Sequence, residues 1–216
     1  MTDPLLGFRR MPSMALTESR RRLPATEGNE RLTALTAVVL LVLLAVEGVT
    51  IVWLRPFLTV HLFVGLMLIP PVALKCASTG YRFARYYTRN PSYRRKGPPQ
   101  ALLRWTAPGV VATTLLVLVT GVWLLLAGPR SREALLPFHK IGFIVWLGLM
   151  SLHVLGHATA LPRVAAAEYT SGAPGSVRRG LAVALALAAG VVVAVALVPH
   201  FHAWQVAHFH HHHHEG

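Results

Sequence analysis

The apolar residues of this 216-residue chain fall into five blocks of about 20 residues, each long enough as an α-helix to cross a bilayer. The chain is 54% apolar and only 13% charged, and a soluble core of this size cannot hide so much apolar surface. The blocks also lack the period-two alternation of barrel strands. These features exclude a soluble enzyme and a β-barrel, and they predict an all-α membrane protein with five transmembrane helices.

The blocks predict a transmembrane domain over residues 32–198. Its helices are expected at 32–54, 57–79, 108–126, 138–160 and 180–198. Residues 1–31 are polar and rich in arginine, which predicts a disordered basic cytoplasmic tail. Residues 199–216 are rich in histidine and form a predicted external tail.

The chain carries a net charge of +13, which in a soluble protein would suggest nucleic acid as a partner. Here the basic residues gather in the N-terminal tail, in the loop 81–104 and in the fourth connection, between apolar blocks. Such an asymmetry orients helices in a bilayer, so we expect no nucleic-acid binding and an N-in, C-out topology. The expected location is the plasma (inner) membrane, with the protein crossing it several times.

Two histidines, His61 and His139, lie near the start of the second and fourth predicted helices, which run in the same direction. His61 follows Pro56 by five residues and His139 follows Pro137 by two, which places both at similar depth in the outer leaflet. Two imidazoles at one depth can ligate one haem iron from opposite sides. An interhelical hydrogen bond is the alternative for each. Gly65 and Gly142 lie one turn further along and would let a flat macrocycle approach, although glycines also serve helix packing.

The fourth block reads FHKIGFIVWLGLMSLHVLGH, in which His153 follows His139 by 14 residues and returns to nearly the same helix face. This segment resembles the ligand helix of di-haem membrane cytochromes b, the group that includes the cytochrome b subunits of hydrogenases and formate dehydrogenases and the ferric-reductase-like proteins. The resemblance covers about residues 57–160. It implies that His61, His139 and His153 ligate haem iron and that the cofactor is haem b, one or two per chain.

The second helix departs from this pattern, because the residue 14 positions after His61 is Lys75. Three interpretations follow: one haem only, an inner haem on His153 or His157 with an open sixth position, or Lys75 as its ligand. Snorkelling of Lys75 to the interface is the alternative for that side chain. His157 lies one turn beyond His153 and could also carry protons or bind a haem propionate.

Glu47 on the first helix lies in the same outer layer as the two histidines. Its carboxylate is a candidate for accepting protons from a quinol, and an interhelical hydrogen bond is the alternative. The C-terminal histidines His208, His210, His211, His212, His213 and His214 could collect a divalent metal.

The sequence as a whole predicts a haem-binding helical bundle that moves electrons between membrane quinone and a peripheral or external redox protein. Whether the chain is an enzyme then depends on that partner, since it would be the electron-transfer subunit of an oxidoreductase. A metal-ion or proton transporter that uses the intramembrane and C-terminal histidines is the second hypothesis. A membrane subunit that only anchors a partner is the third.

Overall fold

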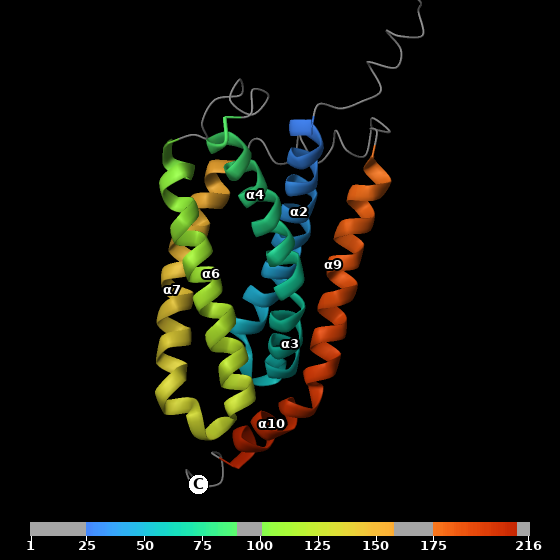
Figure 1. Ribbon diagram of the computed structural model, residues 1–216. Coiled ribbons are helices and arrows are strands. Elements are labelled where there is room, and N and C mark those ends of the chain that lie inside the picture. The colour runs from blue at the N-terminus through green and yellow to red at the C-terminus, as the bar shows by residue number, and fades with distance from the viewer. Residues whose placement is uncertain (1–24, 90–100, 158–174, 211–216) are drawn as a thin grey trace, which may run out of the picture.

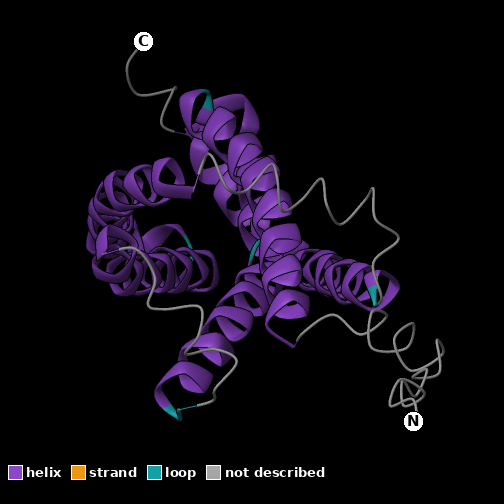
Figure 2. Ribbon diagram, turned by 90° about the horizontal axis from the view of Figure 1, so that it is seen from above, coloured by secondary structure: helices purple, strands orange, loops and turns teal. Residues whose placement is uncertain are grey.

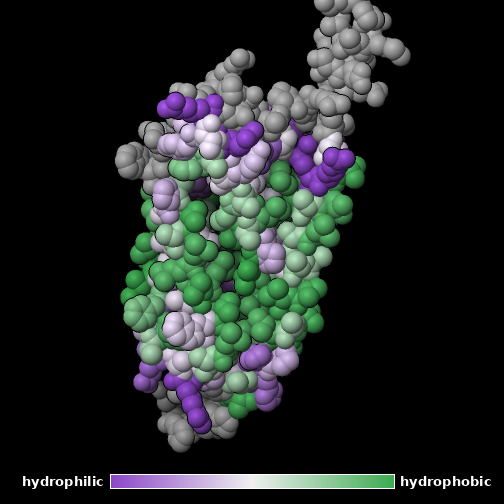
Figure 3. All heavy atoms as spheres, viewed as in Figure 1, coloured by the Kyte–Doolittle hydropathy of each residue, from purple (hydrophilic) through white to green (hydrophobic). Residues whose placement is uncertain are grey.

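The computed structural model describes residues 25–89, 101–157 and 175–210. Five helical segments are long and apolar enough to cross a membrane: Glu27–Val52, Leu54–Tyr87, Thr106–Ala127, Pro129–Gly156 and Ser176–Val206 (Figure 1). The described residues contain no strand. The prediction of an all-α protein with five helices long and apolar enough to cross a membrane is therefore confirmed for the described residues. Figure 3 shows apolar residues across the middle of one face of the molecule, with polar residues gathered toward both ends.

The helices are α2 (Ala25–Val52), α3 (Leu54–Met67), α4 (Ile69–Tyr87), α6 (Ala101–Ala127), α7 (Arg132–His157), α9 (Ser176–Leu197) and α10 (Phe201–His210). Two 3₁₀ turns, η1 (Pro129–Ser131) and η2 (Val198–His200), precede α7 and α10. Helix α6 ends where Gly128 takes a φ of 76°, which a glycine adopts without steric cost. Pro129 then begins η1, where its missing N–H is no loss.

Several helices extend beyond the predicted boundaries. Helix α2 begins at Ala25, inside the predicted tail 1–31, whose first 24 residues lie outside the described part of the chain. Helices α4 and α6 extend into the predicted loop between Gly80 and Thr106, and α10 occupies part of the predicted tail 199–216. Hydropathy marks only where a helix meets lipid, whereas the helix continues as long as its backbone bonds and side-chain contacts are satisfied. Arg82 and Glu30, for example, form an ion pair of 3.6 Å between α4 and α2.

The second span is interrupted at Leu68, where α3 gives way to α4. Pro70 and Pro71 follow after Ile69, and neither has an N–H for the helix ladder. The carbonyl of Met67 thereby loses the donor that residue 71 would supply. Gly190 of α9 lies against this carbonyl, because a Cβ built on Gly190 would come within 2.4 Å of the Met67 oxygen. The interruption in one helix is thus matched by a glycine in its neighbour.

The helices form two groups (Figures 1 and 2). Helices α6 and α7 pack mainly against each other, and α2, α3 and α4 pack together with α9. The groups meet where α3 contacts α6 and where α10 contacts both α3 and η1. We call this the hairpin end, because the turns α2–α3 and α6–α7 both lie there. A core cluster of Leu66, Leu125, Ala194 and Phe201, each at most 4% exposed, joins α3, α6, α9 and α10 near this end.

Candidate functional site

Two histidines from the two helix groups lie near the hairpin end. His61 is on α3 and His139 is on α7, and both helices run away from that end (Figure 1). His61 acts electrostatically on His139. The two residues that the sequence singled out therefore lie in the same region of the bundle, each carried by a different hairpin.

The imidazole of His61 is held by two acceptors on α2. Its Nδ1 lies 2.9 Å from Oε1 of Glu47 and 3.2 Å from Oγ1 of Thr50. The Thr50 hydroxyl donates its own hydrogen to the backbone carbonyl of Glu47 at 2.6 Å, so its oxygen is left to accept. Both contacts therefore place the ring proton on Nδ1, which leaves the lone pair on Nε2.

The imidazole of His139 is held in the same way by α6. Its Nδ1 lies 3.1 Å from Oγ1 of Thr120, and that hydroxyl donates to the carbonyl of Leu116 at 2.7 Å. His139 thus also carries its proton on Nδ1. The backbone of Val117 on α6 forms a further hydrogen bond with the His139 ring. The side-chain contacts of both rings thus fall on Nδ1, an arrangement that leaves Nε2 to act as the lone-pair donor.

Glycines leave space for the Glu47 carboxylate, the His139 ring and the contact between α6 and α7. A Cβ on Gly65 would lie 3.3 Å from Oε1 of Glu47, and a Cβ on Gly121 would lie 3.1 Å from Cε1 of His139. Gly142 faces α6, where a Cβ would lie 3.1 Å from Leu116 and 3.6 Å from Val117. Gly65 and Gly142 therefore lie in contact regions between paired helices, where the small residue permits close approach.

The two threonines were not predicted from the sequence, although a repeat marks them. Residues 49–54 read VTIVWL and residues 119–124 read VTGVWL, so that five of six positions are identical. Each copy stands near the end of the first helix of a hairpin. Each copy also provides the threonine that holds the histidine of the next helix. The site is therefore built from two related half-sites, one for each hairpin.

The other predicted site residues lie away from this pair. Lys75 donates to the Thr33 carbonyl at 2.8 Å, so that its amine is bound to α2, and a role as haem ligand would require this bond to break. His153 is partly buried on α7, in the half of the bundle far from the hairpin end, and its Nδ1 is shielded from solvent. His157 is the last residue of α7. His208 and His210 belong to α10, and His211 to His214 lie outside the described residues.

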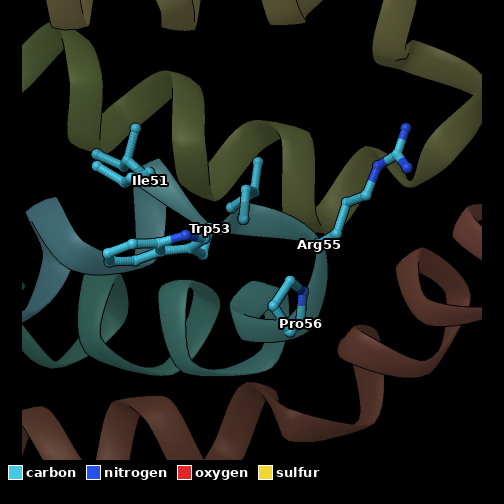
Figure 4. A pocket seen from close by; sticks show the side chains of 6 residues that line it. Ile51, Trp53, Arg55 and Pro56 are labelled. Carbon is cyan, nitrogen blue, oxygen red and sulfur yellow. The ribbon is translucent and has the colours of Figure 1, made fainter.

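A pocket of about 400 Å³ opens at the α2–α3 turn, directly after Thr50. It is lined by Ile51, Val52, Trp53, Leu54, Arg55 and Pro56 (Figure 4). Figure 4 shows Trp53 and Arg55 extending in different directions from this turn. An aromatic ring and a guanidinium thus stand at the hairpin end of the site.

In the described part of the chain, His, Cys, Asp and Glu side chains form no group of three that could hold a metal ion. The donor set at the candidate site is instead a pair of imidazoles. Comparison of the chain with protein-family models, with curated proteins and with solved structures found no match.

Proposed function

We propose that the chain is a b-type cytochrome that holds one haem between His61 and His139. It would transfer electrons between membrane quinol and a peripheral or external redox partner, as the electron-transfer subunit of an oxidoreductase. The proposal rests on the hydrogen-bonding pattern that the two imidazoles share. In both, Nδ1 donates to α2 or α6, and Nε2 is left to bind iron. Histidines that bind metals are typically held through their other ring nitrogen in this way.

The residues present fit a haem. Bis-histidine ligation needs two imidazole nitrogens from facing elements and no third protein ligand. The chain contains one cysteine and no C-x-x-C-H segment, which argues for a non-covalently bound haem. When bound, the haem supplies a one-electron carrier, and the protein fixes its ligands and keeps water from the iron.

We propose an N-in, C-out orientation in the plasma (inner) membrane. Arg82, Arg85 and Arg178 stand at the end opposite the hairpin end, where the positive-inside rule places the cytoplasm. The histidine pair would then lie toward the outer side, and the Trp53–Arg55 pocket would face the outer interface. An external or peripheral partner would meet the site there.

The test is an optical spectrum of the chain purified after haem-replete expression, dithionite-reduced minus oxidised, with a pyridine haemochrome count. We expect a b-type α-band and about one haem per chain. His61→Ala and His139→Ala should each abolish the band. The control His202→Ala changes an exposed histidine of α10 and should retain it. Absence of a Soret band from the wild-type protein would refute the proposal, and a count near two would refute the single-haem form and direct attention to His153.

A further inference from the structure

The two half-sites differ at the residue three positions before the threonine, which is Glu47 in the first hairpin and Val117 in the second. In each repeat, the threonine hydroxyl contacts the backbone carbonyl of the residue three positions earlier. The distance is 2.6 Å from Thr50 to Glu47 and 3.1 Å from Thr120 to Val117. The residue at this position faces the glycine that follows the histidine, Gly65 in one hairpin and Gly142 in the other. The backbone arrangement is therefore shared, and a carboxylate is present in the first half-site only.

We infer that Glu47 is a positioning residue that makes His61 the stronger of the two imidazole ligands. The carboxylate lies 2.9 Å from Nδ1 of His61, a shorter contact than the 3.2 Å from Thr50 or the 3.1 Å from Thr120 to His139. A charged acceptor draws the Nδ1 proton and increases the electron density on Nε2, whereas a hydroxyl does so weakly. The pair is thus unequal although the hairpins are related.

The surroundings favour a strong interaction. The Glu47 side chain is only 12% exposed and that of His61 is 21% exposed, so water screens their contact little. Gly65 leaves the space that the carboxylate occupies, since a Cβ there would lie 3.3 Å from Oε1. The second oxygen of Glu47 lies 3.4 Å from the Thr50 oxygen, so the whole carboxylate stands beside the Thr50–His61 contact.

The consequence for electron transfer rests on the proposed function. A stronger imidazole donor stabilises ferric over ferrous iron and lowers the midpoint potential. Removal of the carboxylate charge in Glu47→Gln should therefore shift the balance toward the reduced form by about tenfold, which is about 59 mV for one electron. The repeat supplies a second variant, because Val117→Glu places a carboxylate beside His139 in the equivalent position.

Two measurements on the full-length chain test the inference. The first is the ¹⁵N NMR spectrum of histidine-labelled protein without haem, in which Glu47→Gln should shift the Nδ1 and Nε2 signals of His61. The second is a spectroelectrochemical titration of the haem-loaded protein. We expect a higher potential in Glu47→Gln, a lower one in Val117→Glu, and a return toward the wild-type value in the double variant Glu47→Val/Val117→Glu. Glu30→Gln, a loss of the same charge at the opposite end of α2, is the control and should change neither readout.

The outcomes separate this inference from the proposed function. If the wild-type chain binds no haem, the proposed function fails, while the NMR arm still decides whether Glu47 polarises His61. If haem binds but Glu47→Gln moves neither the His61 signals nor the potential, the inference is wrong and the cytochrome proposal stands. A potential that rises equally in Glu30→Gln would assign the effect to net charge and would also overturn the positioning role.

Discussion

The contact between Gly190 and the Met67 carbonyl permits a quantitative test of the packing. In Gly190→Ala, the new Cβ would lie 2.4 Å from the carbonyl oxygen and 3.1 Å from both the carbonyl carbon and Cγ of Met67. An ordinary contact begins near 3.4 Å, so α9 and the α3–α4 segment must separate by about 1 Å. The obstacle is backbone next to a buried proline, and it cannot rotate away as a side chain would.

Forcing an extra methyl group into a packed contact costs about 1–3 kcal/mol. For a domain of this size, each kcal/mol lowers the melting temperature by about 2–4 °C, so Gly190→Ala should melt about 2–12 °C below the wild type. Gly180→Ala is the matched control on the same helix, since a Cβ there meets nothing within 4 Å. It should gain up to about 1 kcal/mol from helix propensity.

The assay is the thermal loss of helical circular dichroism in one detergent, with wild type and both variants purified in parallel. The decisive quantity is the difference between the two alanine variants, because both carry the same gain in propensity. The close approach of α9 to Met67 would be disproved if Gly190→Ala proved as stable as Gly180→Ala.

Three further predictions concern the site and the helix contacts. Gly121→Ala should displace the His139 ring, whose Cε1 would lie 3.1 Å from the new Cβ. With the haem site proposed above, this should weaken haem binding by about tenfold in a haem titration. Gly148→Ala, where a Cβ meets nothing within 4 Å, is the control, and equal affinities of the two variants would contradict the assigned geometry. The indole N–H of Trp146 donates to the Thr114 hydroxyl at 2.9 Å. Thr114→Val leaves this N–H without an acceptor and should lower the free energy of unfolding by about 1–3 kcal/mol, whereas Trp146→Phe removes the donor and should lower it by about 0.5–1.5 kcal/mol. The reverse order in denaturant titrations would show that this hydrogen bond does not matter. Thr59→Val should remove the 2.8 Å bond from Gln205 and speed amide exchange in α10, whereas unchanged exchange rates would mean that other contacts hold that helix.

The number of apolar helices could be predicted because block length is a local signal. The start of α7 could not, because the helix begins at Arg132 and includes Pro137, whereas the apolar block predicts a start after that proline. The partner of Lys75 could not be predicted, because the carbonyl of Thr33 belongs to a helix 42 residues away and carries no side-chain signal. The Lys75 amine is instead held by α2.

Thr50 and Thr120 were missed for a different reason. A threonine within a helix commonly bonds to its own backbone, so its type alone indicates no tertiary role. Only comparison of the two VT-x-VWL segments distinguishes these two threonines from Thr36 or Thr113, which also bond to the preceding turn. A repeated segment of six residues was a stronger signal for the site than any single residue within it.

The core cluster near the hairpin end also has a consequence for assembly. Leu66 and Leu125 come from the two hairpins, but Ala194 and Phe201 come from the final part of the chain. During synthesis, each hairpin can enter the bilayer before the cluster exists, with His61 on the first and His139 on the second. Helices α3 and α6 already touch each other, and α9 and α10 then supply the remaining members of the cluster and bury this contact. The part of the chain that follows the second hairpin thus seals the contact between the two hairpins, although it contributes neither His61 nor His139.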